Sequence, residues 1–246
     1  MKKYRGLLLI AAALLVVSAA VFAVQFAAFH DSRDMAFYLL QDLAFLPIQI
    51  LLVVVMVEGI IARQEKARLL HKMNMAIGTF FSDLGNRLLG ELAGAVKNLD
   101  CLKSALAIRT DWSADDWDRA LAAAGKFDCQ VDPDHMNLGS TRELLASRRD
   151  LLTLLLANPN LMEHDRFTDL LWAVSHLVEE LQARDSLADL PTTDRDHLAA
   201  DVRRVYGLLT MEWLIYCRHL QKAYPYIFSL IARTHPLQPN PSATVR

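Results

Sequence analysis

Two apolar segments near the amino terminus, residues 6–29 and 35–62, constrain the fold more than any other feature of this sequence. Each is long enough to cross the hydrocarbon core of a bilayer as a helix, which takes about 20 residues. Only residues 30–34 separate them, so two such helices would have to pack in opposite directions. The sequence therefore predicts a transmembrane hairpin of two spans with a short external loop.

Basic residues flank this predicted hairpin at both outer ends. Residues 1–5 carry lysines and an arginine, and Arg63, Lys66 and Arg68 follow the second span. Since positive charge is retained on the cytoplasmic side, we expect both termini in the cytoplasm. A cleaved signal peptide is the competing interpretation, but its apolar region is about 7–15 residues long, which is shorter than residues 6–29.

Polar side chains interrupt the apolar segments and form a candidate site inside the membrane: Gln25, Gln41, Asp42 and Gln49. A carboxylate at the centre of a bilayer costs about 2.5–3.5 kcal/mol on insertion scales, so such residues suggest function. Two interpretations stay open. Gln25 hydrogen-bonds Gln41 or Asp42 and clasps the hairpin, or Asp42 and Gln49 line an ion or proton path in an oligomer.

Small residues also suggest close contact between membrane helices. Ala19, Ala23 and Ala27 recur every four residues and would give the first span a smooth face. Such faces allow helices to approach closely, either within the hairpin or between copies of the chain. A homo-oligomer is therefore among the expected assemblies.

The helical pattern continues beyond the second span, over residues 63–107, with no proline to end it. Its apolar residues follow the 3.6-residue period, which predicts one spine helix that leaves the membrane and enters a soluble domain. Four glycines on it, Gly78, Gly85, Gly90 and Gly94, are candidate positions either for close helix contact or for a hinge.

Residues 108–235 are predicted to form a cytoplasmic α-helical domain, which the spine helix joins. Ser113, followed by acidic residues, reads as a helix start with a capping box, and no segment outside the membrane alternates as a strand would. The fold class is therefore all-α, with the spine joining a four- to five-helix bundle. Prolines in residues 236–246 predict a disordered tail. The expected helices cover residues 113–125, 140–157, 165–189, 192–224 and 226–233.

Composition excludes some classes of function. The net charge of −2 and the lack of a basic stripe argue against nucleic-acid binding. The three cysteines are widely spaced and odd in number, which fits reduced thiols better than a disulfide framework. The sequence contains no phosphate-binding glycine loop, nucleophile elbow or zincin motif, so we expect no catalytic, cofactor-binding or metal residues.

Two regions nevertheless carry residues capable of chemistry. The loop 127–139 contains aspartates, Cys129 and His135, but lacks zinc-ligand spacing and the EF-hand pattern, which favours a surface turn. Three pairs lie on helices: His176 with Glu179, Asp194 with His197, and Glu212 with His219. The Glu-x-x-His pattern of di-iron bundles is missing, so salt bridges or solvated faces are favoured over a metal or acid–base site.

Three segments resemble a family of bacterial two-span membrane proteins with a cytoplasmic helical domain. They are DLAFLPIQILL at 42–52, NPNLMEH at 158–164 and YPYIFSL at 224–230. The resemblance covers most of the chain and implies a bacterial two-span protein, but it assigns no functional residues.

These observations favour a non-enzymatic integral inner-membrane protein whose cytoplasmic bundle acts as an interaction or signal-relay module. Its expected partners are the lipid bilayer, further copies of itself and a cytoplasmic protein. One alternative is an oligomeric channel lined by Asp42 and Gln49. The other is an enzyme at the membrane surface, which requires the side chains of this set to converge in one cleft: His176, Glu179, Glu212 and His219.

Overall fold

The computed structural model describes residues 16–24, 27, 32–161, 164–238 and 240–244. The chain divides into two compact units, Met1–Lys66 and Ala67–Arg246. Every regular element in the described ranges is a helix, and an isolated bridge pairs Val96 with Val131. The predicted all-α fold class is confirmed.

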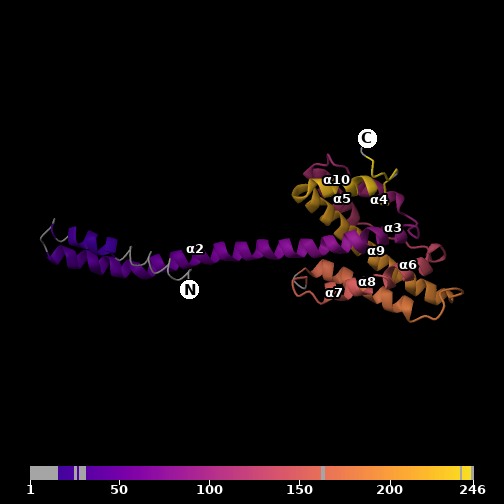
Figure 1. Cartoon of the computed structure of the whole chain (residues 1–246), viewed down its shortest axis with the longest axis horizontal. Helices are drawn as coiled ribbons and strands as arrows, with labels where there is room; N and C mark the ends of the chain where they lie inside the picture. Colours follow the sequence, from indigo (N-terminus) through magenta and orange to yellow (C-terminus); the bar gives the residue numbers. More distant parts are fainter. Residues whose placement is uncertain (1–15, 25–26, 28–31, 162–163, 239, 245–246) are drawn as a thin grey trace. The chain divides into compact units, whose positions relative to one another are not determined.

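The described part of the first unit consists of helical residues 16–24 and 27 and the beginning of α2 (Ser32–Phe80), shown in Figure 1. By length and composition, the helical run Phe37–Ala93 could cross a membrane: its most apolar window has a mean hydropathy of 2.4, with none of it buried. The finer prediction of two spans is not shown, because most of residues 6–15 and 25–31 lies outside the described residues.

Helix α2 also begins earlier than expected. It starts at Ser32, so residues 32–34 of the predicted external loop are helical. Ser32 and Asp34 are residue types that favour the first turn of a helix, which accounts for the early start. Pro47 lies inside α2 and does not end it.

Beyond Lys66, α2 belongs to the second unit and passes into a π-helical turn, Phe81–Gly85, and then α3 (Asn86–Ala93). The prediction of a spine helix to residue 107 is wrong, because α3 ends at Ala93. The chain then turns and pairs with a distant loop: Lys97 N donates to Gln130 O, and Asp132 N donates to Ala95 O, both at 2.8 Å. A separate helix, α4 (Asp100–Leu106), follows.

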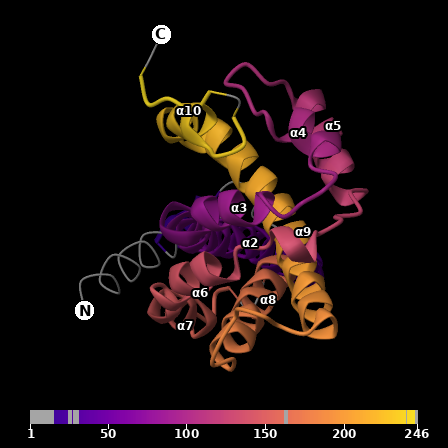
Figure 2. The same cartoon turned by 90° about the vertical axis from the view of Figure 1, so that its right-hand side faces the viewer.

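The remaining helices of the second unit are α5 (Ala114–Gly125), α6 (Leu138–Ala146), α7 (Arg149–Leu156), α8 (Asp165–Gln182), α9 (Thr192–Ala223) and α10 (Pro225–Thr234). Helix α9 is central: α3, α5, α8 and α10 all pack against it, and Figure 2 shows it running diagonally through this unit. Its apolar residues are buried at helical spacing, including Val205, Leu209, Trp213 and Cys217.

The bundle of the second unit contains more and shorter helices than the four or five predicted. Residues 140–157 form two helices, α6 and α7, because the backbone breaks at Ser147 and Arg148. The Ser147 hydroxyl donates to Leu144 O at 2.7 Å, a local bond of the kind that competes with helix continuation. The predicted helix start at Ser113 is confirmed by a reciprocal capping box with Asp116.

The prediction of a disordered tail is also wrong for the described residues 236–238 and 240–244. The Gln238 side chain donates to Ala232 O at 2.6 Å and to Ile108 O at 3.2 Å. Leu237 packs on the hydrophobic core. Proline prevents helix continuation here, but it does not prevent the chain from packing.

Candidate functional site

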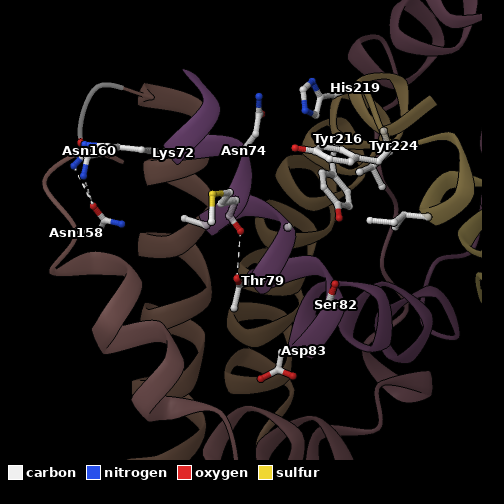
Figure 3. Close-up of a pocket in the computed structure, with 15 residues that line it drawn as sticks. Lys72, Asn74, Thr79, Ser82, Asp83, Asn158, Asn160, Tyr216, His219 and Tyr224 are labelled. Carbon is white, nitrogen blue, oxygen red and sulfur yellow. Dashed lines mark hydrogen bonds between the residues drawn. The ribbon is translucent and has the colours of Figure 1, made fainter. Parts of the chain in front are cut away.

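A hollow of about 830 Å³ lies beside the last turns of α2 in the second unit (Figure 3). Its walls come from α2, the π-helical turn, the turn before α8, and the junction of α9 with α10. The lining residues are Lys72, Asn74, Met75, Ala76, Gly78, Thr79, Ser82, Asp83, Asn158, Asn160, Tyr216, His219, Leu220, Tyr224 and Ile227.

The polar side chains of this hollow gather at two places. Figure 3 shows Asn158 and Asn160 on one side of α2, and Tyr216, His219 and Tyr224 on the other. The asparagines are fixed to each other, since the Asn160 side chain donates to Asn158 Oδ1 at 2.9 Å. Apolar walls with a few polar groups are typical of binding surfaces, so this arrangement suits recognition of a ligand surface.

Tyr216 is the best anchored of these side chains. Its ring stacks on Phe81 with 5.0 Å between centroids, and burial raises the pKa of its phenol. Gly78 lies against it: a Cβ at Gly78 would approach the Tyr216 hydroxyl to 3.4 Å. The glycine thus leaves room for the phenol at the wall of the hollow.

Two of the other three predicted glycines, Gly85 and Gly90, lie at close contacts, and Gly94 does not. A Cβ at Gly85 would come within 2.5 Å of the Phe81 ring, and one at Gly90 within 2.7 Å of Pro236. At Gly94 the nearest atom would be a backbone oxygen at 3.8 Å. Close packing therefore accounts for Gly85 and Gly90, and Gly94 adjoins the end of α3.

The predicted intramembrane cluster is described only in part. Gln41, Asp42 and Gln49 lie on α2 with exposed side chains. Gln25 lies outside the described residues, so the clasp between the two spans stays a prediction. Ala19, Ala23 and Ala27 of the first span are helical and exposed, and the close helix contact expected of them stays a prediction.

The predicted helix pairs are rearranged in the structure. His176 faces Glu180 instead of Glu179, with 3.8 Å between His176 Nε2 and Glu180 Oε1. Asp194 is held by Arg184 through two hydrogen bonds of 2.6 and 2.8 Å, and His197 turns toward Glu180. Sequence reasoning missed Glu180, although it lies four residues after His176, a spacing that places both on one helix face.

Asp201 is the other residue of this region that the sequence reasoning missed. It lies on α9, four residues after His197, and its side chain is 4% exposed. His176 and His197 both approach Asp201 Oδ2, at 3.5 and 3.7 Å. Glu180, His197 and Asp201 thus place potential metal-ligand atoms within 4.8 Å of one another.

Glu212 and His219 do not form a pair. Glu212 is buried on α9, and its Oε2 lies 4.0 Å from His164 Nε2, whereas His219 lines the hollow. Burial raises the pKa of the Glu212 carboxyl. The three predicted acid–base partners His176, Glu212 and His219 therefore have different surroundings, and the predicted single cleft is not formed.

The loop 127–139 contains a short helical turn, Pro133–His135. Asp132 caps this turn, accepts from Asp134 N at 3.2 Å, and contacts His135 at 2.9 Å. Cys129 is buried, and burial raises the pKa of its thiol to about 11. The local hydrogen bonds of Asp132 fit the turn interpretation.

Two protein-family models match the chain. One, described as "MJ1433, N-terminal helical domain", matches residues 2–61, and the other, "Uncharacterized protein MJ1433, C-terminal helical domain", matches residues 69–233. The boundary between them coincides with the division between Lys66 and Ala67.

A protein of Methanocaldococcus jannaschii with the name "Uncharacterized protein MJ1433" is 38% identical over 237 residues, which are 96% of this chain and 95% of that protein. This relative is archaeal, so the expectation of a bacterial family is not supported. No solved structure matches the chain.

Proposed function

The chain belongs to the MJ1433 family of proteins with an N-terminal and a C-terminal helical domain, and from this premise we propose that it is a non-enzymatic, membrane-anchored interaction module. The first unit supplies the anchor. The second unit presents the hollow beside α2 to a cytoplasmic protein partner.

One observation carries the anchor: every side chain from Phe37 to Lys66 is exposed, although most of the first 25 are large and apolar. Removing a valine, leucine or isoleucine side chain from water stabilises by about 1.5–3 kcal/mol. A bilayer provides that environment along the whole helix, whose backbone groups already bond one another. Arg63, Lys66 and Arg68 follow, which supports a cytoplasmic second unit at the inner membrane.

The hollow supports the role of an interaction module. It is formed by residues 72–83 of the chain, directly after the basic residues, together with the ends of α9 and α10. Met75 is 62% exposed at its edge, and apolar walls with amide and hydroxyl groups fit a peptide segment of another protein. The enzyme alternative has less support, because His176, Glu212 and His219 do not line one cleft.

Membrane extraction and site-specific photo-cross-linking test this proposal together. The protein should remain in the membrane pellet after an alkaline carbonate wash. A photoreactive residue at Met75 should then cross-link a partner in native membranes. The same residue at Trp172, which is 63% exposed on α8 and does not line the hollow, is the matched control.

Release by carbonate would contradict the anchor. Equal cross-linking at both positions, or none at Met75, would contradict the docking role of the hollow. If reconstituted bilayers instead conduct ions and Asp42→Asn abolishes the current, the protein is a channel and the proposal is wrong.

A further inference from the structure

Helix α8 packs against α9 (Figure 2). Two helical histidine–carboxylate pairs face each other across this contact. His176 and Glu180 lie on α8, and His197 and Asp201 lie on α9. In both pairs the residues are four apart, so they share one face of their helix. Four potential ligands from two helices are thus brought to one place.

The four side chains form a closed ring of contacts. His176 Nε2 lies 3.8 Å from Glu180 Oε1, and Glu180 Oε2 lies 3.5 Å from His197 Nε2. Asp201 Oδ2 completes the ring, at 3.7 Å from His197 and 3.5 Å from His176. Histidine and carboxylate alternate around it, which separates like charges.

Asp201 is the second, independent sign of a ligand. Only 4% of its side chain is exposed, and its Oδ2 has no hydrogen-bond partner among the described residues. Arg204 donates to the other oxygen, Oδ1, at 3.0 Å. A buried carboxylate oxygen without a donor is costly, and this one lies next to the imidazole nitrogens of both His176 and His197.

We propose that His176, Glu180, His197 and Asp201 bind a divalent transition-metal cation of the zinc class. Zinc bonds of about 2.0–2.2 Å in a tetrahedron place neighbouring ligand atoms roughly 3.4 Å apart. The four contacts along the ring, at 3.5–3.8 Å, are within a few tenths of an ångström of that spacing. Glu180, His197 and Asp201 already bring their ligand atoms within 4.8 Å of one another, and His176 adjoins this group through Asp201 and Glu180. Two imidazoles with two carboxylates suit zinc, manganese or iron, whereas magnesium and calcium prefer oxygen ligands alone.

Arg184 holds one of the carboxylates of this site in place. Arg184 contacts Glu180 Oε2 at 2.8 Å and, through its other hydrogen bonds, Asp194. The hydrogen bond from Arg184 lowers the pKa of the Glu180 carboxyl, which favours the ionised form that a metal requires. His176 and His197 keep 44% and 51% of their side chains exposed, so a cation can enter from solvent. The bound ion would tie α8 to α9.

The test uses the purified full-length protein in detergent, stripped with a chelator and titrated with Zn²⁺ by calorimetry. We expect one Zn²⁺ per chain and a higher melting temperature when it is bound. The double variant H176Q/H197Q should lose roughly 100-fold or more in affinity, since it removes both nitrogen ligands. It should fold, because both side chains are partly exposed, and circular dichroism checks this.

Glu179→Gln is the matched control, because Glu179 is the exposed neighbour of Glu180 and lies outside the ring. It should bind Zn²⁺ as the wild type does, and Mg²⁺ should give no comparable heat. Absence of Zn²⁺ binding by the wild type, or equal binding by H176Q/H197Q, would overturn the site. Unchanged affinity in Asp201→Asn would also overturn it.

Discussion

Leu51 and Phe80 lie on the same helix, α2, yet Leu51 leaves 63% of its surface exposed and Phe80 is completely buried. Around Leu51, in the first unit, apolar residues occupy all sides of the helix. Around Phe80, in the second unit, they recur on one side and meet α8 and α9 residues. A helix that is apolar all round finds its environment in lipid, whereas one with an apolar stripe finds it in a protein core.

We expect the largest effect when charged side chains are introduced into the exposed apolar segment of the first unit. The double variant V53R/V54R should abolish membrane association, because each arginine costs about 2.5–3.5 kcal/mol at the centre of a span. Flotation of membranes in a density gradient measures the effect. V53L/V54L is the control and should float as the wild type does; flotation of the arginine variant would show that lipid does not surround this segment.

A large-to-small substitution in the second unit tests whether its apolar residues form a protein core. Phe80→Ala should destabilise this unit by about 3–5 kcal/mol, since Phe80 contacts Phe81 and Phe167 edge to face at 5.2 and 5.4 Å. Denaturant unfolding followed by tryptophan fluorescence reports on this unit, which contains all four tryptophans. Phe37→Ala, at an exposed position of the first unit, should leave the transition unchanged; equal shifts would contradict the distinction.

A buried histidine in the core of the second unit makes the stability of this unit depend on pH. His235 is 2% exposed beside Trp213, and burial lowers its pKa from 6.5 to about 4. The folded state therefore holds this proton less tightly than the unfolded state. The stabilisation that the neutral ring contributes is complete above pH 6.5 and is lost as the pH falls toward 4, by about 3 kcal/mol.

His235→Phe should remove that part of the pH dependence. Unfolding free energies at pH 7 and pH 4 measure it. His135→Gln, at an exposed histidine, is the control and should retain the wild-type slope. A variant at position 235 with the full wild-type slope would mean that other groups cause the acid sensitivity.

The smallest effect concerns a helix end in water. Ser113→Ala removes the side chain that accepts from Asp116 N at 3.3 Å and donates to Asp116 Oδ2 at 2.7 Å. Loss of such a cap costs about 0.5–2 kcal/mol, less than the loss of Phe80. Thermal melting measures the shift, and Ser186→Ala in a loop serves as the control. A larger loss than that of Phe80→Ala would contradict the dominance of core packing.

Local signals predicted the long helices of the second unit but not their breaks. Ser113 and the apolar period of α9 are visible in the sequence, and both predictions held. The end of α3 depends on bonds from Lys97 and Asp132 to residues about thirty positions away, which no local pattern encodes. The prediction of a disordered tail rested on its prolines. It failed because the tertiary hydrogen bonds of Gln238 to Ile108 and Ala232 have no local sequence signal.

The candidate sites depend even more on tertiary structure. The four-residue spacing of His176 and Glu180, and of His197 and Asp201, can be read from the sequence. Their meeting cannot, because it depends on how α8 aligns with α9. Asp201 is a buried carboxylate in a helix. From sequence alone, an aspartate in a helix is expected to face solvent, so its burial could not be predicted. Tyr216 and Gly78, which shape the hollow, likewise come from distant parts of the chain.

Cysteine labelling in lipid nanodiscs tests the contrast between the two units most directly. Cys101 is an exposed natural thiol of the second unit, and V53C in a C101S background places a thiol in the first. A water-soluble maleimide should label Cys101 in intact discs and V53C only after detergent or denaturant is added. Labelling of V53C in intact discs as fast as that of Cys101 would contradict the membrane anchor.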